Sequence, residues 1–216
     1  MRKRYVTAFT LAGVALVTRG LQCRKEYPPE IIPVYQYAEK LTLSSFKKVY
    51  AIDDTIWVQF QTLDKTLYDK LSGRRLSTDT TFLNFFFDLT RQYPLEFNLE
   101  NYAEVIVQNG LNVRFGPMVA PMDQLTFNTG CNDDPYFFKA GIVLKKTGVF
   151  TLLPGAVVNP CPGKKSVLPS SFIFTFDLAD CNKDVWLPIA SQSNNGLNSY
   201  IDVGIDRKEV FAFKVE

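Results

Sequence analysis

The chain has 216 residues, of which 46% are hydrophobic and 21% are charged, with four cysteines and no histidine. This composition is typical of one folded domain of sandwich or barrel size, and it excludes a disordered chain and a multi-span membrane protein. The lack of histidine excludes Ser-His-Asp and Cys-His nucleophile systems, histidine-ligated metals and an imidazole general base. We therefore expect a protein that is not an enzyme and that has no cofactor.

The N-terminus has the pattern of an export signal. Residues 1–4 contain three bases, and residues 5–17 form an apolar run that is too short to span a bilayer but has the length of a signal-peptide core. We predict a signal peptide over residues 1–22. Its removal leaves 20 bases and 22 acids, a net charge of about −2. The remaining bases form short pairs, such as Arg74-Arg75, rather than the clustered face that binds nucleic acid, so we expect no nucleic-acid partner.

Cys23 follows the leader in Gly20-Leu21-Gln22-Cys23, which resembles a bacterial lipobox, whose cysteine becomes the lipidated first residue. A lipobox usually has a small residue where Gln22 stands, so cleavage after Gly20 is the alternative. Three prolines between residues 28 and 33 favour an extended spacer. We predict a lipid-anchor cysteine and tether over residues 23–45, which holds the chain on the membrane without a transmembrane helix. A soluble periplasmic or secreted protein is the alternative.

From residue 46 onward, apolar and polar residues alternate with the period of two that is typical of strands. The clearest case is residues 82–90, where Leu83, Phe85, Phe87 and Leu89 share one face. Dipeptides such as Pro154-Gly155 indicate turns between the strands. Helix signals are weak. Many short strands with a high aromatic content predict an all-β, antiparallel β-sandwich over residues 46–216.

Two neighbouring carboxylates, Asp53 and Asp54, open the predicted strand at residues 55–61. Carboxylates in loops at the end of a sandwich can bind Ca²⁺. The alternative is that both are turn carboxylates, one of which accepts hydrogen bonds from local backbone N–H groups.

The cysteines predict one disulfide. With Cys23 acylated, Cys131, Cys161 and Cys181 remain, which allows one bridge and one thiol; without acylation, two bridges are possible. Strand patterns at residues 136–144 and 149–158 flank a polar turn, and pairing them as a hairpin brings Cys131 opposite residue 162. We therefore predict Cys131–Cys161, with Cys161–Cys181 as the alternative. Zinc is not expected, because no C-x-x-C pair is present.

Trp186 lies in the segment 182–188, whose Asn, Asp and Pro residues are typical of a loop. It is therefore the aromatic residue that we expect to be best exposed for stacking on a sugar. Strand aromatics such as Trp57 are more often part of a core.

Several strand and turn segments resemble uncharacterised cell-envelope lipoproteins of Bacteroidota. The segments are residues 52–57, 67–73, 82–89, 136–148 and 210–215. The resemblance implies an immunoglobulin-like sandwich located in the cell envelope, at the outer membrane, and it supplies no catalytic residue.

Together these patterns predict a non-enzymatic binding or accessory lipoprotein with a protein or glycan partner. One alternative is a carbohydrate-binding module or a glycan-processing accessory protein. The other is a calcium-stabilised, adhesin-like domain.

Overall fold

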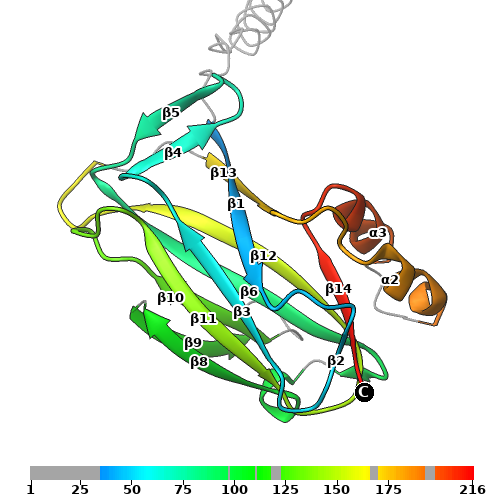
Figure 1. Cartoon of the computed structure of the whole chain (residues 1–216). Coiled ribbons are helices and arrows are strands. Elements are labelled where there is room, and N and C mark those ends of the chain that lie inside the picture. Colours follow the sequence, from blue (N-terminus) through cyan, green and yellow to red (C-terminus); the bar gives the residue numbers. More distant parts are fainter. Residues whose placement is uncertain (1–34, 97, 110, 118–122, 166–169, 193–197) are drawn as a thin grey trace, which may run out of the picture. The chain divides into compact units, whose positions relative to one another are not determined.

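The computed structural model describes residues 35–96, 98–109, 111–117, 123–165, 170–192 and 198–216 (Figure 1). The chain divides into two units, Met1–Ile32 and Pro33–Glu216. Because the described residues begin at Tyr35, the predicted signal peptide and Cys23 lie outside them. Within those residues, no helix has both the length and the apolar character needed to cross a bilayer.

The described strands form two sheets of seven strands. In the first sheet, β13 pairs with β1 in parallel and the other pairs are antiparallel. In spatial order, the strands along the sheet are β5 (Arg74–Ser77), β4 (Thr66–Asp69), β1 (Tyr35–Ser44), β3 (Thr55–Gln61), β11 (Phe137–Leu144) and β8 (Ala103–Asn109). The remaining strand, β13 (Ser170–Phe176), lies off this order and pairs with β1.

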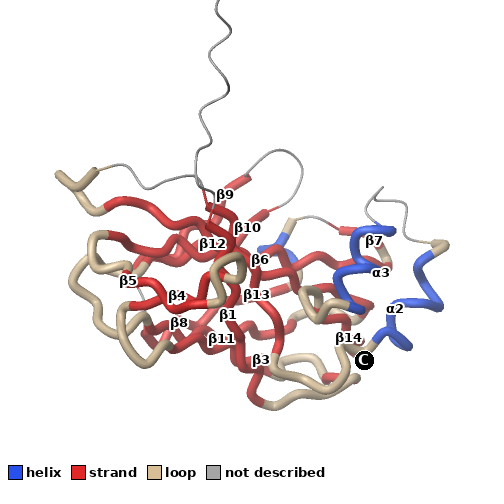
Figure 2. The backbone as a smooth tube through the Cα atoms, turned by 90° about the horizontal axis from the view of Figure 1, so that it is seen from above, coloured by secondary structure: helices blue, strands red, loops and turns tan. Residues whose placement is uncertain are grey.

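In the second sheet, β2 pairs with β14 in parallel, and the other pairs are antiparallel. The short strand β7 pairs with β6. The strands of this sheet are β2 (Val49–Tyr50), β14 (Phe211–Val215), β12 (Gly148–Pro160), β6 (Thr81–Tyr93), β10 (Asp123–Asn128), β9 (Leu111–Pro117) and β7 (Leu95–Glu96). The described helical elements are η1 (Leu99–Asn101), α2 (Lys183–Ala190) and α3 (Asn198–Asp206). Figure 2 shows α2 and α3 together beside β14. The predicted all-β, antiparallel sandwich is confirmed.

Phenylalanine rings from both sheets meet in the middle of the sandwich. Phe85 of β6 is fully buried, and its ring centroid lies 4.7 Å from that of Phe138, 5.3 Å from that of Phe60 and 5.7 Å from that of Phe174. These partners belong to β11, β3 and β13 of the opposite sheet. Tilted rings at these spacings combine a large buried area with favourable ring–ring geometry. The two layers are therefore joined by the residues that the alternation in β6 points inward.

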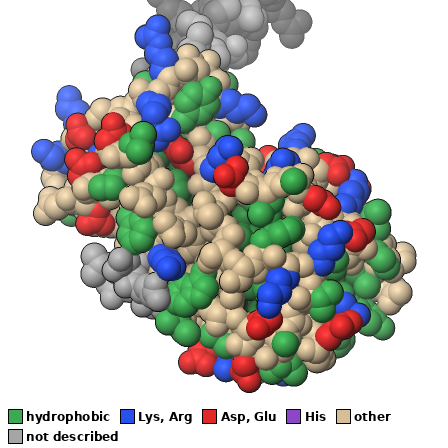
Figure 3. Space-filling view, in the orientation of Figure 1, with side chains coloured by type: hydrophobic (Ala, Val, Ile, Leu, Met, Phe, Trp, Pro, Cys, Tyr) green, Lys and Arg blue, Asp and Glu red, His purple; other side chains and the backbone are tan. Residues whose placement is uncertain are grey.

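Charges on the surface are mostly arranged in pairs of opposite sign. Figure 3 shows lysine and arginine side chains next to acidic ones over much of the visible face. Examples are Lys183 with Asp206 and Lys40 with Asp177, both exposed. Exposed pairs of this kind contribute little to stability, so the buried rings dominate the stability of the fold.

The N-terminal boundary of the sandwich lies earlier than predicted. Residues 35–44, which we assigned to the tether, form β1 in the first sheet. Tyr37, Leu41 and Leu43 are buried there, and β1 pairs with β13 over seven residues. The prediction of a tether up to residue 45 is wrong. These residues form a strand because they pair in parallel with β13, which lies about 135 residues further along the sequence.

The predicted hairpin of residues 136–144 and 149–158 is also wrong. β11 pairs with β3 and β8 in the first sheet, whereas β12 pairs with β6 and β14 in the second. The short turn between them therefore crosses from one layer to the other. Nor is Pro154-Gly155 a turn, since it lies inside β12 opposite Phe87 and Phe86. A Cβ at Gly155 would lie 2.1 Å from the Phe86 ring, so glycine is needed there for close packing.

The structure contains the disulfide Cys131–Cys161, with the two Cα atoms 5.8 Å apart. The hairpin register that predicted this pair does not exist, because β11 and β12 do not pair with each other. Instead, the loop after β10 and the end of β12 lie on the two sides of β6. The alternative partner, Cys181, is a buried free thiol, and burial raises the pKa of this thiol to about 11.

We expect Phe85→Ala to lower the free energy of unfolding by about 3–5 kcal/mol, because it leaves a cavity between the two layers. Phe82→Ala is the matched control, since Phe82 lies on the other face of the same strand and is only partly buried. Urea unfolding of both variants measures the difference. Equal losses would show that β6 does not place Phe85 between the sheets.

Candidate functional site

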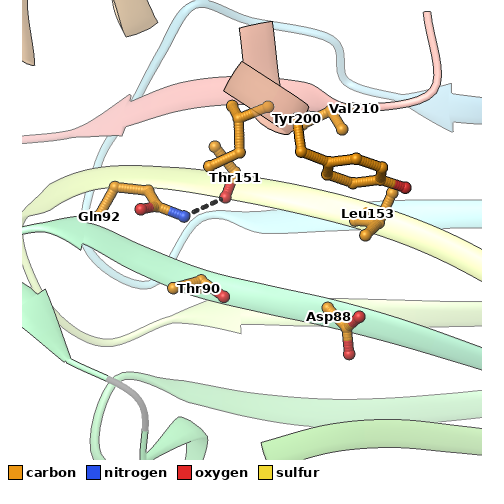
Figure 4. A pocket seen from close by; sticks show the side chains of 8 residues that line it. Asp88, Thr90, Gln92, Thr151, Leu153, Tyr200 and Val210 are labelled. Atoms are coloured by element: carbon orange, nitrogen blue, oxygen red, sulfur yellow. Dashed lines mark hydrogen bonds between the residues drawn. The ribbon is translucent and has the colours of Figure 1, made fainter. Parts of the chain in front are cut away.

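A cavity of about 280 Å³ lies between α3 and the outer face of the second sheet (Figure 4). Strands β6 and β12 form its floor, and α3 forms its roof. The lining residues are Asp88, Thr90, Gln92, Thr151, Leu153, Tyr200, Ile201 and Val210.

The floor follows from the alternation of β6. Because Phe87 and Leu89 point into the sandwich, Asp88, Thr90 and Gln92 point out of it. The register places Thr90 beside Thr151 and Asp88 beside Leu153. These outward side chains from two strands form one continuous patch.

The roof is held close by a glycine. Ile201 and Ile205, one helical turn apart, are buried against the domain, and Gly204 is on the same side of α3. A Cβ at Gly204 would lie 2.5 Å from Cγ2 of Val210. The backbone N–H groups of Glu209 and Val210 donate to the Gly204 carbonyl at 2.7 and 3.1 Å. The end of α3 is thereby fixed to the start of β14, which places Tyr200 and Ile201 over the floor.

The polar groups of the floor are buried and hydrogen-bonded. Gln92 is 2% exposed, and its Nε2 donates to Oγ1 of Thr151 at 2.7 Å. Tyr200 is half exposed at the rim. Burial, followed by the carboxylates of Glu209 and Asp88, raises the pKa of the Tyr200 hydroxyl, so this group stays protonated at neutral pH. In this state it can donate a hydrogen bond.

The arrangement suits binding of a small, mostly apolar molecule. Ligand pockets in proteins combine apolar walls with a few convergent polar groups, and their volumes begin near about 300 Å³. Here the walls are aliphatic, and Asp88, Gln92 and the Tyr200 hydroxyl supply polar groups on different sides.

Asp53 and Asp54 are not in this pocket; they shape the turn before β3. Oδ1 of Asp53 accepts from Nζ of Lys145 at 3.0 Å. Oδ2 of Asp54 accepts from the Ala51 N–H at 2.9 Å and from Nζ of Lys47 at 3.1 Å, and these bonds lower the pKa of the Asp54 carboxyl. In the part of the chain that the structure describes, no three His, Cys, Asp or Glu side chains gather as metal ligands. The geometry matches the turn interpretation.

The prediction that Trp186 is exposed is wrong. The segment 182–188 is not a loop but mostly α2, and Trp186 is fully buried with Ile189 on the face of this helix that packs in the core. Asn182, with a left-handed backbone (φ 62°), turns the chain into the helix. Asn182 and Asp184 therefore occupy the start of a helix, and Pro188 lies inside it. The tryptophan three residues before Ile189 faces inward.

Trp57 instead lies on the outer face of the first sheet, partly buried. Its strand neighbours Ile56 and Val58 point into the core. The ring fills the space above Gly141, where a Cβ would lie 3.0 Å from it, and Nζ of Lys139 is 5.1 Å from the ring centroid. This is an outward aromatic surface on the side of the sandwich opposite to the pocket.

The motifs in the sequence did not indicate the pocket residues. Two features of the sequence could have indicated the pocket. Thr90 and Gln92 occupy outward positions of a long strand, and Ile201 and Ile205 lie four residues apart on a segment long enough for a helix. A half-apolar helix near the C-terminus needs a surface to cover, and the outward face of β6 is that surface.

Comparisons with known proteins do not assign a family. No family profile matches the sequence, and no curated protein matches it. Among solved structures, a non-cellulosomal cohesin from the hyperthermophilic archaeon Archaeoglobus fulgidus is similar at a TM-score of 0.29 and 12% identity, over 66% of this chain and 88% of the cohesin chain. A similarity of this size carries no argument about function.

Naphthylmethanol, a small neutral fluorescent probe, is expected to bind the pocket with a dissociation constant on the order of 1 mM. Leu153→Trp fills the pocket and should weaken this binding at least about tenfold. The control is Val157→Trp, on the same face of β12 but outside the lining. Fluorescence titration checks both; equal binding by Leu153→Trp and the wild type would exclude the pocket as the site.

Proposed function

We propose that this protein is an exported, lipid-anchored β-sandwich that binds a small ligand or the side chain of a partner, and that it is not an enzyme. The observation that carries the proposal is the pocket under α3, which combines aliphatic walls with a buried, hydrogen-bonded polar floor. Such a site offers shape and a few polar contacts, which is the chemistry of recognition.

The groups in the described lining favour binding over catalysis. Glycoside hydrolysis needs two carboxylates about 5–10 Å apart, and Asp88 is the one carboxylate in this lining. Tyr200 stays protonated at neutral pH. Thr90 and Thr151 are nearly fully buried, and Oγ1 of Thr151 already accepts from Gln92. The described lining contains no Ser, Cys or Lys that could serve as a nucleophile.

The lipid anchor is supported by the N-terminal pattern and by where the fold begins. The first strand starts at Tyr35, 12 residues after Cys23. An extended chain of that length spans at most about 40 Å. An acylated Cys23 would therefore keep the sandwich close to the membrane surface. Together with the resemblance to cell-envelope lipoproteins, this favours the outer membrane of a bacterium.

Cys23→Ser should abolish the anchor. In cells fed a labelled fatty acid, the wild-type chain should carry the label and sediment with membranes, and the variant should lose both properties. Cys181→Ser, which removes a buried thiol of the folded domain, should retain label and membrane association. A Cys23→Ser chain that still sediments with membranes, or a wild-type chain without label, would contradict the anchor.

A carbohydrate-binding module is the second candidate, and the outward ring of Trp57 favours it. An indole ring can stack on a sugar, and Gln59 and Lys139, both partly buried on the same face, could donate hydrogen bonds to sugar hydroxyls. This surface and the pocket lie on opposite sheets. The two candidates are therefore separable, because glycan binding on Trp57 would be unaffected by Leu153→Trp.

A further inference from the structure

The pocket under α3 has its ionisable groups at one end. In Figure 4 the Tyr200 ring extends from α3 across the strands toward Leu153, above the side on which Asp88 lies, and the bonded pair Gln92 and Thr151 lies on the other side. The surfaces between these two ends are aliphatic side chains from β12, α3 and the residue before β14. A ligand in this pocket thus has one polar head position and an apolar body position.

The ionisable groups of the described lining, the Asp88 carboxylate and the Tyr200 hydroxyl, lie at the head position. The described lining contains the carboxylate of Asp88 and no lysine or arginine. Burial is the largest cause that raises the pKa of Tyr200, followed by Glu209, which lies outside the lining, and by Asp88 within it; the guanidinium of Arg207 lowers this pKa. A carboxylate attracts an ammonium group and repels an anion, so the described lining favours a cation over an anion at this end.

Asp88 is held in place for such a contact. It lies in the middle of β6, beside Leu153 of β12, and is partly buried. It already makes a contact within the chain. A carboxylate has two oxygens with about four acceptor positions, so it can accept a further hydrogen bond from a ligand. Hydrogen bonds to charged donors are about twice as strong as neutral ones.

We propose that the pocket binds a small apolar amine in its ammonium form, with the ammonium donating to Asp88 and the apolar body against Leu153, Ile201 and Val210. The Tyr200 ring covers the body at the rim. This inference rests on the proposed function, because it names the ligand class of the same pocket.

Three probes that share a naphthalene ring test the inference: naphthylmethylamine (cationic), naphthylmethanol (neutral) and naphthoate (anionic). They are titrated into the full-length chain, and binding to the Leu153→Trp chain is subtracted as the contribution of other sites. The amine should bind about tenfold more tightly than the alcohol, and the carboxylate more weakly than the alcohol. The preference for the amine should shrink at 1 M salt, where the Debye length is about 3 Å.

Asp88→Asn keeps the shape of the side chain and removes its charge. It should reduce the affinity for the amine to that for the alcohol and leave the affinity for the alcohol unchanged. Asp79→Asn is the control, since Asp79 is exposed outside the pocket and the same charge change should leave the preference intact. If Asp88→Asn fails to fold, the order of the three probes on the wild type and its salt dependence still decide the question.

The outcomes separate this inference from the proposed function. Equal affinities for the three probes, or a preference for the amine that survives in Asp88→Asn, would overturn the amine while leaving the pocket as a binding site. No binding beyond that of Leu153→Trp by any probe would overturn the pocket itself, and with it the amine.

Discussion

Contact between phenylalanine rings of opposite sheets is the interaction on which the rest of this structure depends. The ring of Phe85 contacts the rings of Phe60, Phe138 and Phe174, so a single residue of β6 packs against three strands of the other layer. Because side chains alternate along a strand, a shift of β6 by one residue would turn Phe85 outward and Phe86 inward. The ring contacts therefore fix the register of β6, and with it the identity of every outward side chain.

The pocket follows from that register. Once Phe87 and Leu89 point inward, Asp88 and Thr90 must point outward, and an outward threonine would ordinarily face water. Here α3 covers this part of the sheet, so the floor is polar but buried, and its groups must bond to one another or to the chain. The Gln92–Thr151 bond meets this requirement. A polar floor under an apolar roof thus results from placing a helix on the outer face of a sheet.

The sequence predicted what depends on local alternation and missed what depends on distant contacts. The inward face of β6 was predictable residue by residue, because period two needs no knowledge of the partner strand. The disulfide pair Cys131–Cys161 was named through a hairpin that does not exist, since a short turn can join two strands within a sheet or cross between sheets. β1, α2 and the pocket were missed because parallel pairing and helix docking are settled by segments far away in the chain.

Amide hydrogen exchange under native conditions tests most directly whether the two layers form one core. The slowest amides should lie in β3, β6, β11 and β12 and should share one opening free energy, equal to that of global unfolding, because ring contacts between the layers make the sheets open together. Amides of α3 and of the β4–β5 hairpin should exchange through smaller, local openings. Separate opening free energies for the two sheets, or slowest exchange in α3, would contradict this account.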